Sequence, residues 1–315
     1  MTITQLKYVL AVAEHKNFTL AAEKCFVTQP TLSMQIQKIE EELSILIFDR
    51  SKKPIQLTEI GQKIVNQAKN IVNEADRIQD IVEQQKGFIG GEFRLGIIPT
   101  IMPTLLPMFL NNFIKKYPKV KLIIEELNTE EIIVKLNNGH LDAAIAATPL
   151  QEEKIKEIVL YFEPFMAYIP ESHEHFDKKE IEISDLNLDE ILLLQDGHCF
   201  RDGILNLCKN NPKNEFSHFQ IESGSFETLI KLADEGLGTT LLPFLHTLDL
   251  KEADKLKLRH FKEPKPAREV SLIYPKSELK IQIIDALRST IAGVIKGAIV
   301  FQNVEVISPL AKSRN

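Results

Sequence analysis

The sequence has no long apolar run and few cysteines. No stretch reaches the roughly 18 consecutive apolar residues that indicate a membrane helix. The first residues, MTITQLKYVLAV, lack the basic segment and longer apolar core of a secretory signal. The 3 cysteines are an odd number and do not indicate a disulfide framework. We therefore expect a cytoplasmic protein, in which thiols rest reduced.

An excess of positive charge is also lacking. The 315 residues carry a net charge of −6, and residues 1–90 hold as many acidic as basic side chains. An acidic body suppresses non-specific binding to nucleic acids. Any binding to DNA must therefore depend on where individual cations lie. The length is sufficient for two or three domains with their own cores.

The pattern of residues 1–58 predicts short helices with tight connections. Thr2 opens a capping-box pattern at the first helix. We expect Thr19 to cap a second helix and Thr28 a third, with Pro30 in its first turn. The third helix has an apolar stripe at Leu32, Ile36, Ile39 and Leu43. Two helices joined by a short turn, the second with a polar outer face, form a helix-turn-helix.

The next segment predicts a wing and a long helix. Basic residues precede Pro54 and a short alternating strand from Ile55 to Leu57. Thr58 then caps a helix that runs to about Gln85, with apolar residues in heptad spacing at Ile64, Ala68, Ile71, Ala75, Ile78 and Val82. Because the rest of this helix is polar, we expect it to pair with a second copy. Gly87 to Gly91 is interpreted as a flexible hinge.

From Glu92 onward, predicted strands and helices alternate. The order to residue 147 is strand, helix, strand, helix, strand, which is typical of a parallel sheet. A second such set begins near Ile155, with strands expected at 191–196, 218–223 and 239–244 and a helix around 227–238. A strand at 267–275 and a final helix from about Ser277 complete this α/β domain. The tail after Lys296 is weakly patterned.

Three segments resemble one family of bacterial proteins. FTLAAEKCFVTQPTLSMQIQKIEEELSILIFDR resembles the DNA-binding domain of LysR-type transcriptional regulators. LNNGHLDAAI and GLGTTLLP resemble the two-lobed effector domain of that family. The resemblance implies a periplasmic-binding-protein-like α/β sensor. It divides the chain into a winged helix-turn-helix (1–58), a linker and dimerisation helix (59–86), a hinge (87–91), a sensor (92–300, with lobe I about 92–162 and 267–300 and lobe II about 163–266) and a tail (301–315).

The start of a recognition helix presents N–H groups and short side chains to phosphates and base edges. We expect such contacts from Thr28, Gln29, Pro30, Thr31, Ser33 and Gln35, and phosphate binding by Lys38, Arg50, Lys52 and Lys53. Alternatively, Thr28 and Ser33 only cap and solvate the helix. Many relatives place an arginine in this helix, whereas Met34 and Gln37 occupy the candidate positions here. We interpret Glu40 to Glu42 as a solvated face.

The segment DGHCFRDGILNLC resembles the redox segment of the hydrogen-peroxide sensors of this family. Cys199 and Cys208 match its two redox cysteines, and His198 and Asp202 match its flanking polar residues. Two cysteines in a cytosolic protein, taken alone, are usually structural. The resemblance instead implies a reversible disulfide between Cys199 and Cys208.

Peroxide chemistry needs a thiolate and a donor. A free thiol with a pKa of about 8.5 is mostly protonated, but Cys199 precedes a predicted helix whose dipole can favour the thiolate. A donor must stabilise the leaving hydroxide. The resemblance implies a peroxide-binding pocket of Thr100, Thr129, His198, Cys199, Asp202, His218 and Arg268. Thr100 and Thr129 are also potential helix caps, and His218 a potential strand residue. Cys25 is expected to pack in a core.

If the two cysteines bracket a helix, nine residues at 1.5 Å rise separate their Cα atoms by roughly 13 Å. A disulfide tolerates only about 7 Å. Closure must therefore unwind the helix, and Gly203 lowers the cost of doing so.

Three functions are compatible with these features. The first is a transcriptional activator that responds to peroxide, and the second is a LysR-type regulator with a small metabolite in its cleft and incidental cysteines. The third, a thiol peroxidase, is disfavoured by the DNA-binding domain and the absence of a CxxC partner, so we do not expect an enzyme. Expected partners are promoter DNA, further copies forming a homodimer and homotetramer, hydrogen peroxide as the signal, RNA polymerase and a thiol reductant. No cofactor, metal or membrane partner is expected.

Overall fold

The computed structural model describes residues 1–85, 89–208, 223–299 and 304–309. The chain forms two compact units, one built mainly from the residues before Ile89 and the other mainly from those after it. Among the described residues, no helix is both long enough and apolar enough to cross a membrane.

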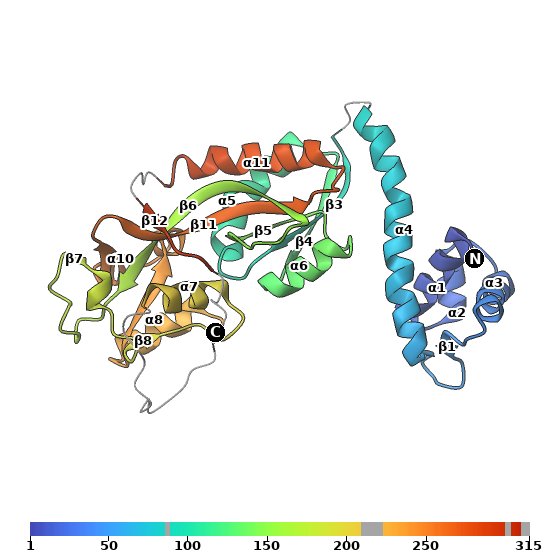
Figure 1. Ribbon diagram of the computed structural model, residues 1–315, viewed down its shortest axis with the longest axis horizontal. Coiled ribbons are helices and arrows are strands. Elements are labelled where there is room, and N and C mark those ends of the chain that lie inside the picture. The colour runs from blue at the N-terminus through green and yellow to red at the C-terminus, as the bar shows by residue number, and fades with distance from the viewer. Residues whose placement is uncertain (86–88, 209–222, 300–303, 310–315) are drawn as a thin grey trace. The chain divides into compact units, whose positions relative to one another are not determined.

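The first unit is a winged helix-turn-helix followed by a long helix (Figure 1). Thr2 forms the predicted capping box, and the Thr28 side chain accepts from the backbone of the third helix. The second helix is capped by Asn17, whose extended backbone lets its side chain accept from two N–H groups, so the prediction of Thr19 is wrong by two residues. The elements are α1 (Ile3–His15), α2 (Phe18–Lys24), α3 (Gln29–Leu43), β1 (Phe48–Asp49), β2 (Gln56–Leu57) and α4 (Glu59–Gln85).

The apolar stripe of α3 ends earlier than predicted. Leu32, Ile36 and Ile39 are buried, but Leu43 is 36% exposed. The last buried position of the helix is taken by a carboxylate, Glu40. The core of this unit therefore contains a buried carboxylate beside its apolar side chains.

Helix α4 divides its apolar residues between two environments. Val65, Ala68 and Val72 are buried in the core shared with α1, and Ile64 and Ile71 pack against that core in part. Ile78 is 64% exposed. The side chain of Val82 lies outside the described residues. Part of the predicted heptad seam thus belongs to the core of its own unit.

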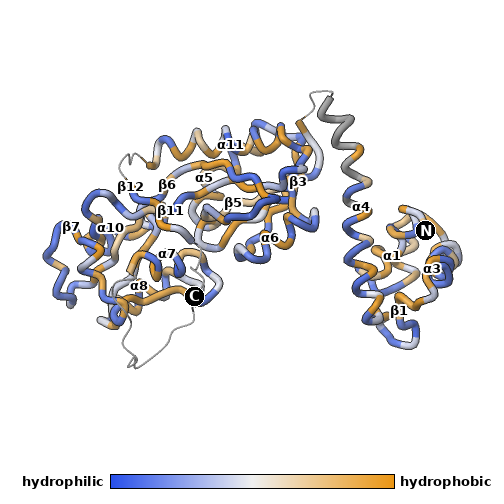
Figure 2. The backbone as a smooth tube through the Cα atoms, in the orientation of Figure 1, coloured by the Kyte–Doolittle hydropathy of each residue, from blue (hydrophilic) through white to orange (hydrophobic). Residues whose placement is uncertain are grey.

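The second unit begins with the predicted strand–helix–strand–helix–strand order. Strand β3 pairs in parallel with both β4 and β5. Helices α5 and α11 lie together along this sheet, and α11 carries both hydrophobic and hydrophilic residues along its length (Figures 1 and 2). The elements are β3 (Gly91–Ile97), α5 (Met102–Lys116), β4 (Val120–Glu126), α6 (Thr129–Asn137), β5 (Ala143–Thr148) and, near the end of the chain, α11 (Ile281–Ile295), which starts four residues after the predicted Ser277.

The remainder of the unit differs from a second parallel set. The long strand β6 is antiparallel to β9, β10 and β11, and only β7–β10 and β8–β9 are parallel pairs among these strands. Of the strand predicted at 218–223, residues 218–222 lie outside the described residues. The elements are β6 (Ile155–Tyr168), β7 (Glu180–Ile181), β8 (Ile191–Leu192), α7 (Cys199–Leu207), α8 (Phe226–Asp234), β9 (Thr239–Pro243), α9 (Phe244–Leu248), α10 (Glu252–Lys255), β10 (Leu258–Phe261) and β11 (Lys265–Pro275), with a 3₁₀ turn at Ile183–Asp185.

This second unit has two hydrophobic cores. The first core lies around β3, β5, α5 and α11, and the second core lies around β8, β9, α7 and α8. Strand β6 contributes residues to both cores and so connects them, and β11 pairs with it along its length.

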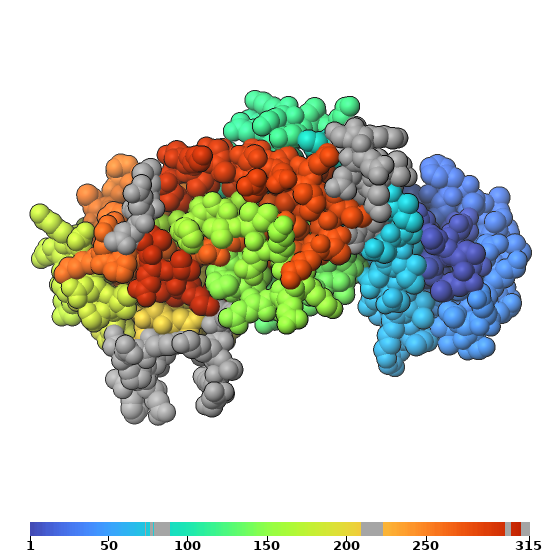
Figure 3. All heavy atoms as spheres, turned by 45° about the horizontal axis from the view of Figure 1, so that its top comes forward, coloured from blue at the N-terminus to red at the C-terminus, as the bar shows by residue number. Residues whose placement is uncertain are grey.

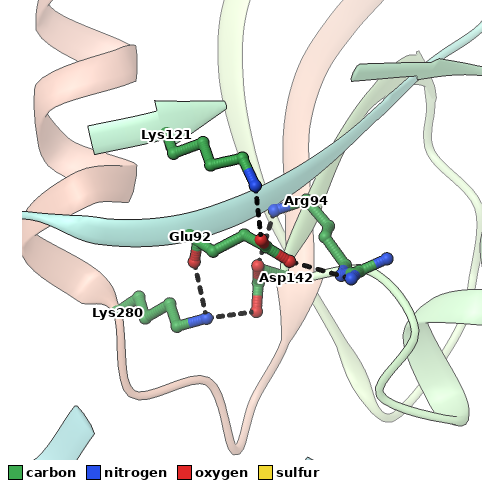
Figure 4. Close-up of polar contacts among 5 residues, drawn as sticks. All are labelled: Glu92, Arg94, Lys121, Asp142 and Lys280. Atoms are coloured by element: carbon green, nitrogen blue, oxygen red, sulfur yellow. Dashed lines mark hydrogen bonds and ion pairs between the residues drawn. The ribbon is translucent and has the colours of Figure 1, made fainter. Parts of the chain in front are cut away.

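A charged network fixes the start of the first sheet (Figure 4). Glu92 on β3 accepts from Arg94 at 2.8 Å and Lys121 at 3.2 Å. Asp142 accepts from the Arg94 backbone at 2.6 Å, and Lys280, just before α11, donates to Asp142 at 3.0 Å. These contacts hold β3, β4 and the start of α11 in register.

Three residues of the weakly patterned tail form a strand. Strand β12 (Val304–Val306) pairs in parallel with β11 at Lys265 to Ala267. The Ile307 N–H continues this ladder to the Ala267 carbonyl at 2.8 Å. Figure 3 shows this C-terminal segment, in red, against the body of the second unit.

Candidate functional site

The two cysteines of interest bracket one helix. Helix α7 begins at Cys199 and is followed by Cys208 as its C-cap, as expected from the sequence. Both thiols are free and buried, 8% and 2% exposed. Cys199 packs in the first core and Cys208 in the second. Because a helix of this length separates the Cα atoms by roughly 13 Å, the thiols cannot bond without rearrangement.

Some groups around Cys199 raise the pKa of its thiol and others lower it. Burial raises the pKa of Cys199 above its ordinary value and is the largest influence. The Arg268 charge, the Thr129 hydroxyl and a backbone N–H lower this pKa, whereas Asp202 raises it. The expected help from the helix start is therefore outweighed by burial, and the resting thiol is mostly protonated at neutral pH.

Arg268 on β11 is the residue that lowers the pKa of the Cys199 thiol most. Its guanidinium is held in place by several hydrogen bonds. Its Nε and Nη2 donate to Glu163 Oε2 at 2.9 and 2.7 Å. Its Nη1 and Nη2 donate to the hydroxyl and carbonyl of Thr100 at 2.8 and 3.0 Å. The guanidinium lies 5.3 Å from the ring centroid of Phe200, the residue after Cys199. A buried charge with this many partners has a fixed position.

Neither threonine of the predicted pocket acts as a helix cap. The Thr100 hydroxyl is engaged by Arg268. Helix α6 is capped by Asn128, whose side chain accepts from the Glu131 N–H at 2.8 Å. The Thr129 hydroxyl is buried and has no hydrogen-bond partner among the residues that the structure describes. It lies close enough to the Cys199 sulfur to lower the pKa of the thiol, so this sulfur is the acceptor toward which the hydroxyl can donate.

His198 and Asp202 flank the thiol on α7. Burial lowers the pKa of His198, which keeps the imidazole neutral, with the Glu126 charge as a smaller opposing influence. Burial raises the pKa of Asp202, opposed by the charge of Arg201. An aspartate with a raised pKa retains its proton more readily and is a candidate acid. The remaining predicted pocket residue, His218, lies outside the described residues.

Two residues at this site were not predicted. Glu163 is fully buried, and its second oxygen accepts from the Leu245 N–H at 2.8 Å. Tyr161 lies two residues earlier on β6, and its buried hydroxyl has no hydrogen-bond partner within the described part of the chain. A carboxylate inside the apolar strand YFEPFMAY signals a paired charge, because an isolated one is too costly to bury.

The start of α3 forms an exposed polar surface. Thr28, Gln29, Pro30, Thr31 and Lys38 are exposed, whereas Ser33 and Gln35 are partly buried. The hydroxyls of Thr28 and Thr31 form a hydrogen bond with each other at 2.8 Å. Gln35 Oε1 accepts from Gln5 of α1 at 3.1 Å, so this predicted base-contacting side chain is also tied to the body of the unit.

The wing is anchored by an ion pair between the buried carboxylate of Glu40 and the partly exposed Arg50. Glu40 accepts from the backbone N–H groups of Ile47 and Phe48 at 2.8 and 3.2 Å, and from Arg50 at 2.9 Å. The interpretation of Glu40 as solvated is wrong, because these donors replace water around its carboxylate. Arg50 also lies over the Phe18 ring, whereas Lys52 and Lys53 are exposed. Lys52 and Lys53 are therefore better placed than Arg50 to bind phosphates.

Comparisons with known proteins agree with this architecture. The model of the bacterial regulatory helix-turn-helix, lysR family, matches residues 3–62, and that of the LysR substrate binding domain matches 86–294. The transcriptional dual regulator OxyR of Escherichia coli is 33% identical over 93% of this chain and 97% of that protein. A full-length OxyR variant from Pseudomonas aeruginosa has a TM-score of 0.74 at 35% identity, covering 93% of this chain and 98% of that one. A hydrogen-peroxide-bound OxyR mutant of Corynebacterium glutamicum has a TM-score of 0.64 at 28% identity, covering 97% and 98%.

Proposed function

Because this chain belongs to the LysR family of transcriptional regulators and is closely related to OxyR proteins, we propose that it senses hydrogen peroxide through a reversible Cys199–Cys208 disulfide. The helix-turn-helix binds DNA, and the disulfide changes which promoter contacts the assembled protein makes. The observation that carries the proposal is the placement of two buried thiols at opposite ends of one helix, the first beside Arg268 and the unpaired Thr129 hydroxyl.

The first chemical step is a two-electron oxidation of Cys199. Its thiolate attacks one oxygen of hydrogen peroxide, the O–O bond breaks, and a sulfenic acid forms as hydroxide leaves. Asp202 supplies the proton that converts the hydroxide to water. Thr129 donates to the peroxide, and Arg268 stabilises the negative charge that moves from sulfur to oxygen.

In the second step, the Cys208 thiol gives up its proton and its sulfur attacks the sulfenic sulfur, which breaks the S–O bond and forms the disulfide. The hydroxide that leaves takes up this proton and becomes water. Burial raises the pKa of Cys208 to about 11, so this thiol is inert until the helix opens. A cellular thiol reductant returns both cysteines to thiols with two electrons.

Disulfide closure dismantles α7 and the contacts that depend on it. Phe200 and Ile204 are buried in the second core, and Asn206 Nδ2 donates to the Ser308 carbonyl of the tail at 2.9 Å. Moving Cys208 toward the first core pulls these groups away from their neighbours. The two states are two packings of the same segment, and oxidation selects between them.

Assembly transmits this change to DNA. The exposed part of α4 pairs with a second subunit, and two such dimers form the tetramer that spans a promoter and acts with RNA polymerase. A change in how the sensor units pack alters the spacing between the DNA-binding units, and spacing determines which half-sites a dimer reads.

The proposal is tested by footprinting reduced and peroxide-treated protein on a duplex that the wild-type protein selects from a random pool. We expect peroxide to change the footprint of the wild type and of Cys25→Ser, but not that of Cys199→Ser. A Cys199→Ser footprint that still changes with peroxide contradicts the proposal. A wild-type footprint that changes only with an added metabolite would support the alternative of a small-molecule effector.

A further inference from the structure

An aromatic side chain stands out from the turn between α2 and α3. Phe26 is 96% exposed, although large apolar side chains of this unit mostly lie in its core. Its backbone has a φ of 56°, in the left-handed region that bulky residues rarely adopt. Neither burial nor backbone preference explains a phenylalanine here, because Asn or Gly would fit this conformation with less strain.

The turn that carries Phe26 is rigid. The Phe26 N–H donates to the Glu23 carbonyl at 3.1 Å, and the next N–H, of Val27, donates to the Ala22 carbonyl at 3.0 Å. Ala22 is buried in the core of the unit. The ring is therefore presented from a fixed position, with little of the ordering cost that a mobile loop would incur on binding.

The Phe26 ring lies close in sequence to the start of the recognition helix. Phe26 lies two residues before Thr28, the cap of α3, and the first residues of a recognition helix face base edges in the major groove. Cys25 and Val27 on either side of Phe26 are partly buried, and the next residues along the chain, Lys24, Thr28 and Gln29, are polar and exposed. A single ring in a polar rim is too small an apolar surface for a protein interface.

We propose that Phe26 reads a thymine in the DNA target through its C5-methyl group. This methyl is the apolar feature of the major groove, and phenylalanine is among the side chains that contact it. The inference rests on DNA binding by the helix-turn-helix and is independent of the redox proposal. It adds a sequence preference to a recognition helix that also exposes Met34 and Gln37.

The test uses full-length protein and a duplex that the wild type selects from a random pool. Each thymine is replaced in turn by deoxyuridine, which removes only the methyl group, and affinity is measured by fluorescence anisotropy at one salt concentration. We expect one replacement per half-site to weaken wild-type binding about fourfold, the effect of losing one buried methyl. In Phe26→Asn the same replacement has no effect, and this variant binds the unmodified duplex more weakly than the wild type.

The control is Leu46→Asn, which removes another exposed apolar side chain (65%) of the same unit outside the α2–α3 turn. This variant should keep the wild-type response to deoxyuridine, and Phe26→Asn should melt no lower than the wild type. Equal deoxyuridine losses in wild type and Phe26→Asn would overturn the inference, as would a changed oligomeric state of Phe26→Asn by light scattering. If the wild type selects no duplex, DNA binding itself fails and the inference fails with it.

Discussion

Arg268 donates two hydrogen bonds to one carboxylate oxygen of Glu163, at 2.9 and 2.7 Å, and both side chains are almost fully buried. The two residues face each other on adjacent strands, β11 and β6. Glu163 therefore fixes Arg268 in position but also offsets part of its charge. The Arg268 charge still lowers the pKa of Cys199, but burial of the thiol is the larger influence, so this pKa remains above its ordinary value.

The first prediction concerns pH. Because the pKa of Cys199 is raised, the reactive thiolate is scarce at neutral pH, and its oxidation rate should rise as pH increases toward that pKa. Arg268→Gln removes a cation that lowers this pKa, so its rate at pH 7 should fall about tenfold for each unit of further rise. Stopped-flow oxidation across pH 6 to 9 checks this. Arg94→Gln, at an exposed cation of the same unit, is the control and should follow the wild type.

Asp202 should be the proton donor to the leaving hydroxide. Asp202→Asn keeps the shape of the side chain but removes its proton, and peroxide oxidation should slow by about 10². Asp196→Asn is a matched control, because Asp196 is 87% exposed and pairs with Arg201. Rates are followed with a sulfenic-acid probe. Equal rates in both variants would exclude Asp202 as the acid.

Assembly should depend on the exposed part of α4. Ile78→Glu places a carboxylate in the predicted heptad seam, where pairing with a second copy would bury it without a partner. We expect light scattering at micromolar concentration to give a dimer or tetramer for the wild type and for Gln67→Glu, and a monomer for Ile78→Glu. Ile71→Glu should also prevent DNA binding, but Ile71 packs against its own core, so that variant loses stability as well. A monomeric wild type would contradict the proposal that the exposed part of α4 pairs with a second copy.

The tail should report the state of α7. Oxidation should reduce amide-exchange protection from Phe200 to Leu207 and at Ile307, because the unwound helix releases the hydrogen bond from Asn206 to Ser308. Amides of β3 serve as the internal control and should not change. Unchanged protection of α7 in protein with a confirmed disulfide would show that the helix does not unwind.

Local patterns predicted the parts of this structure that local chemistry determines. Thr28 capping α3 and the two cysteines bracketing α7 follow from short-range spacing. The buried Glu40 was misassigned because its donors come from the wing, several residues away.

The parts that the sequence did not predict depend on distant residues. Glu163 and Arg268 are 105 positions apart, and their pairing arises only when β6 and β11 align. The tail strand was missed for the same reason, because its pattern becomes a strand only through pairing with β11. The family resemblance supplied Arg268 as a site residue, but not the carboxylate that holds it.

Mass mapping of cysteine states tests the central claim most directly. Reduced protein is treated with about one equivalent of hydrogen peroxide, alkylated and digested without reductant. We expect a peptide pair joined through Cys199 and Cys208, with Cys25 alkylated, and a sulfenic or over-oxidised Cys199 in Cys208→Ser. Peroxide-treated protein in which Cys199 and Cys208 are both alkylated, or in which Cys208 alone is oxidised, would contradict the account.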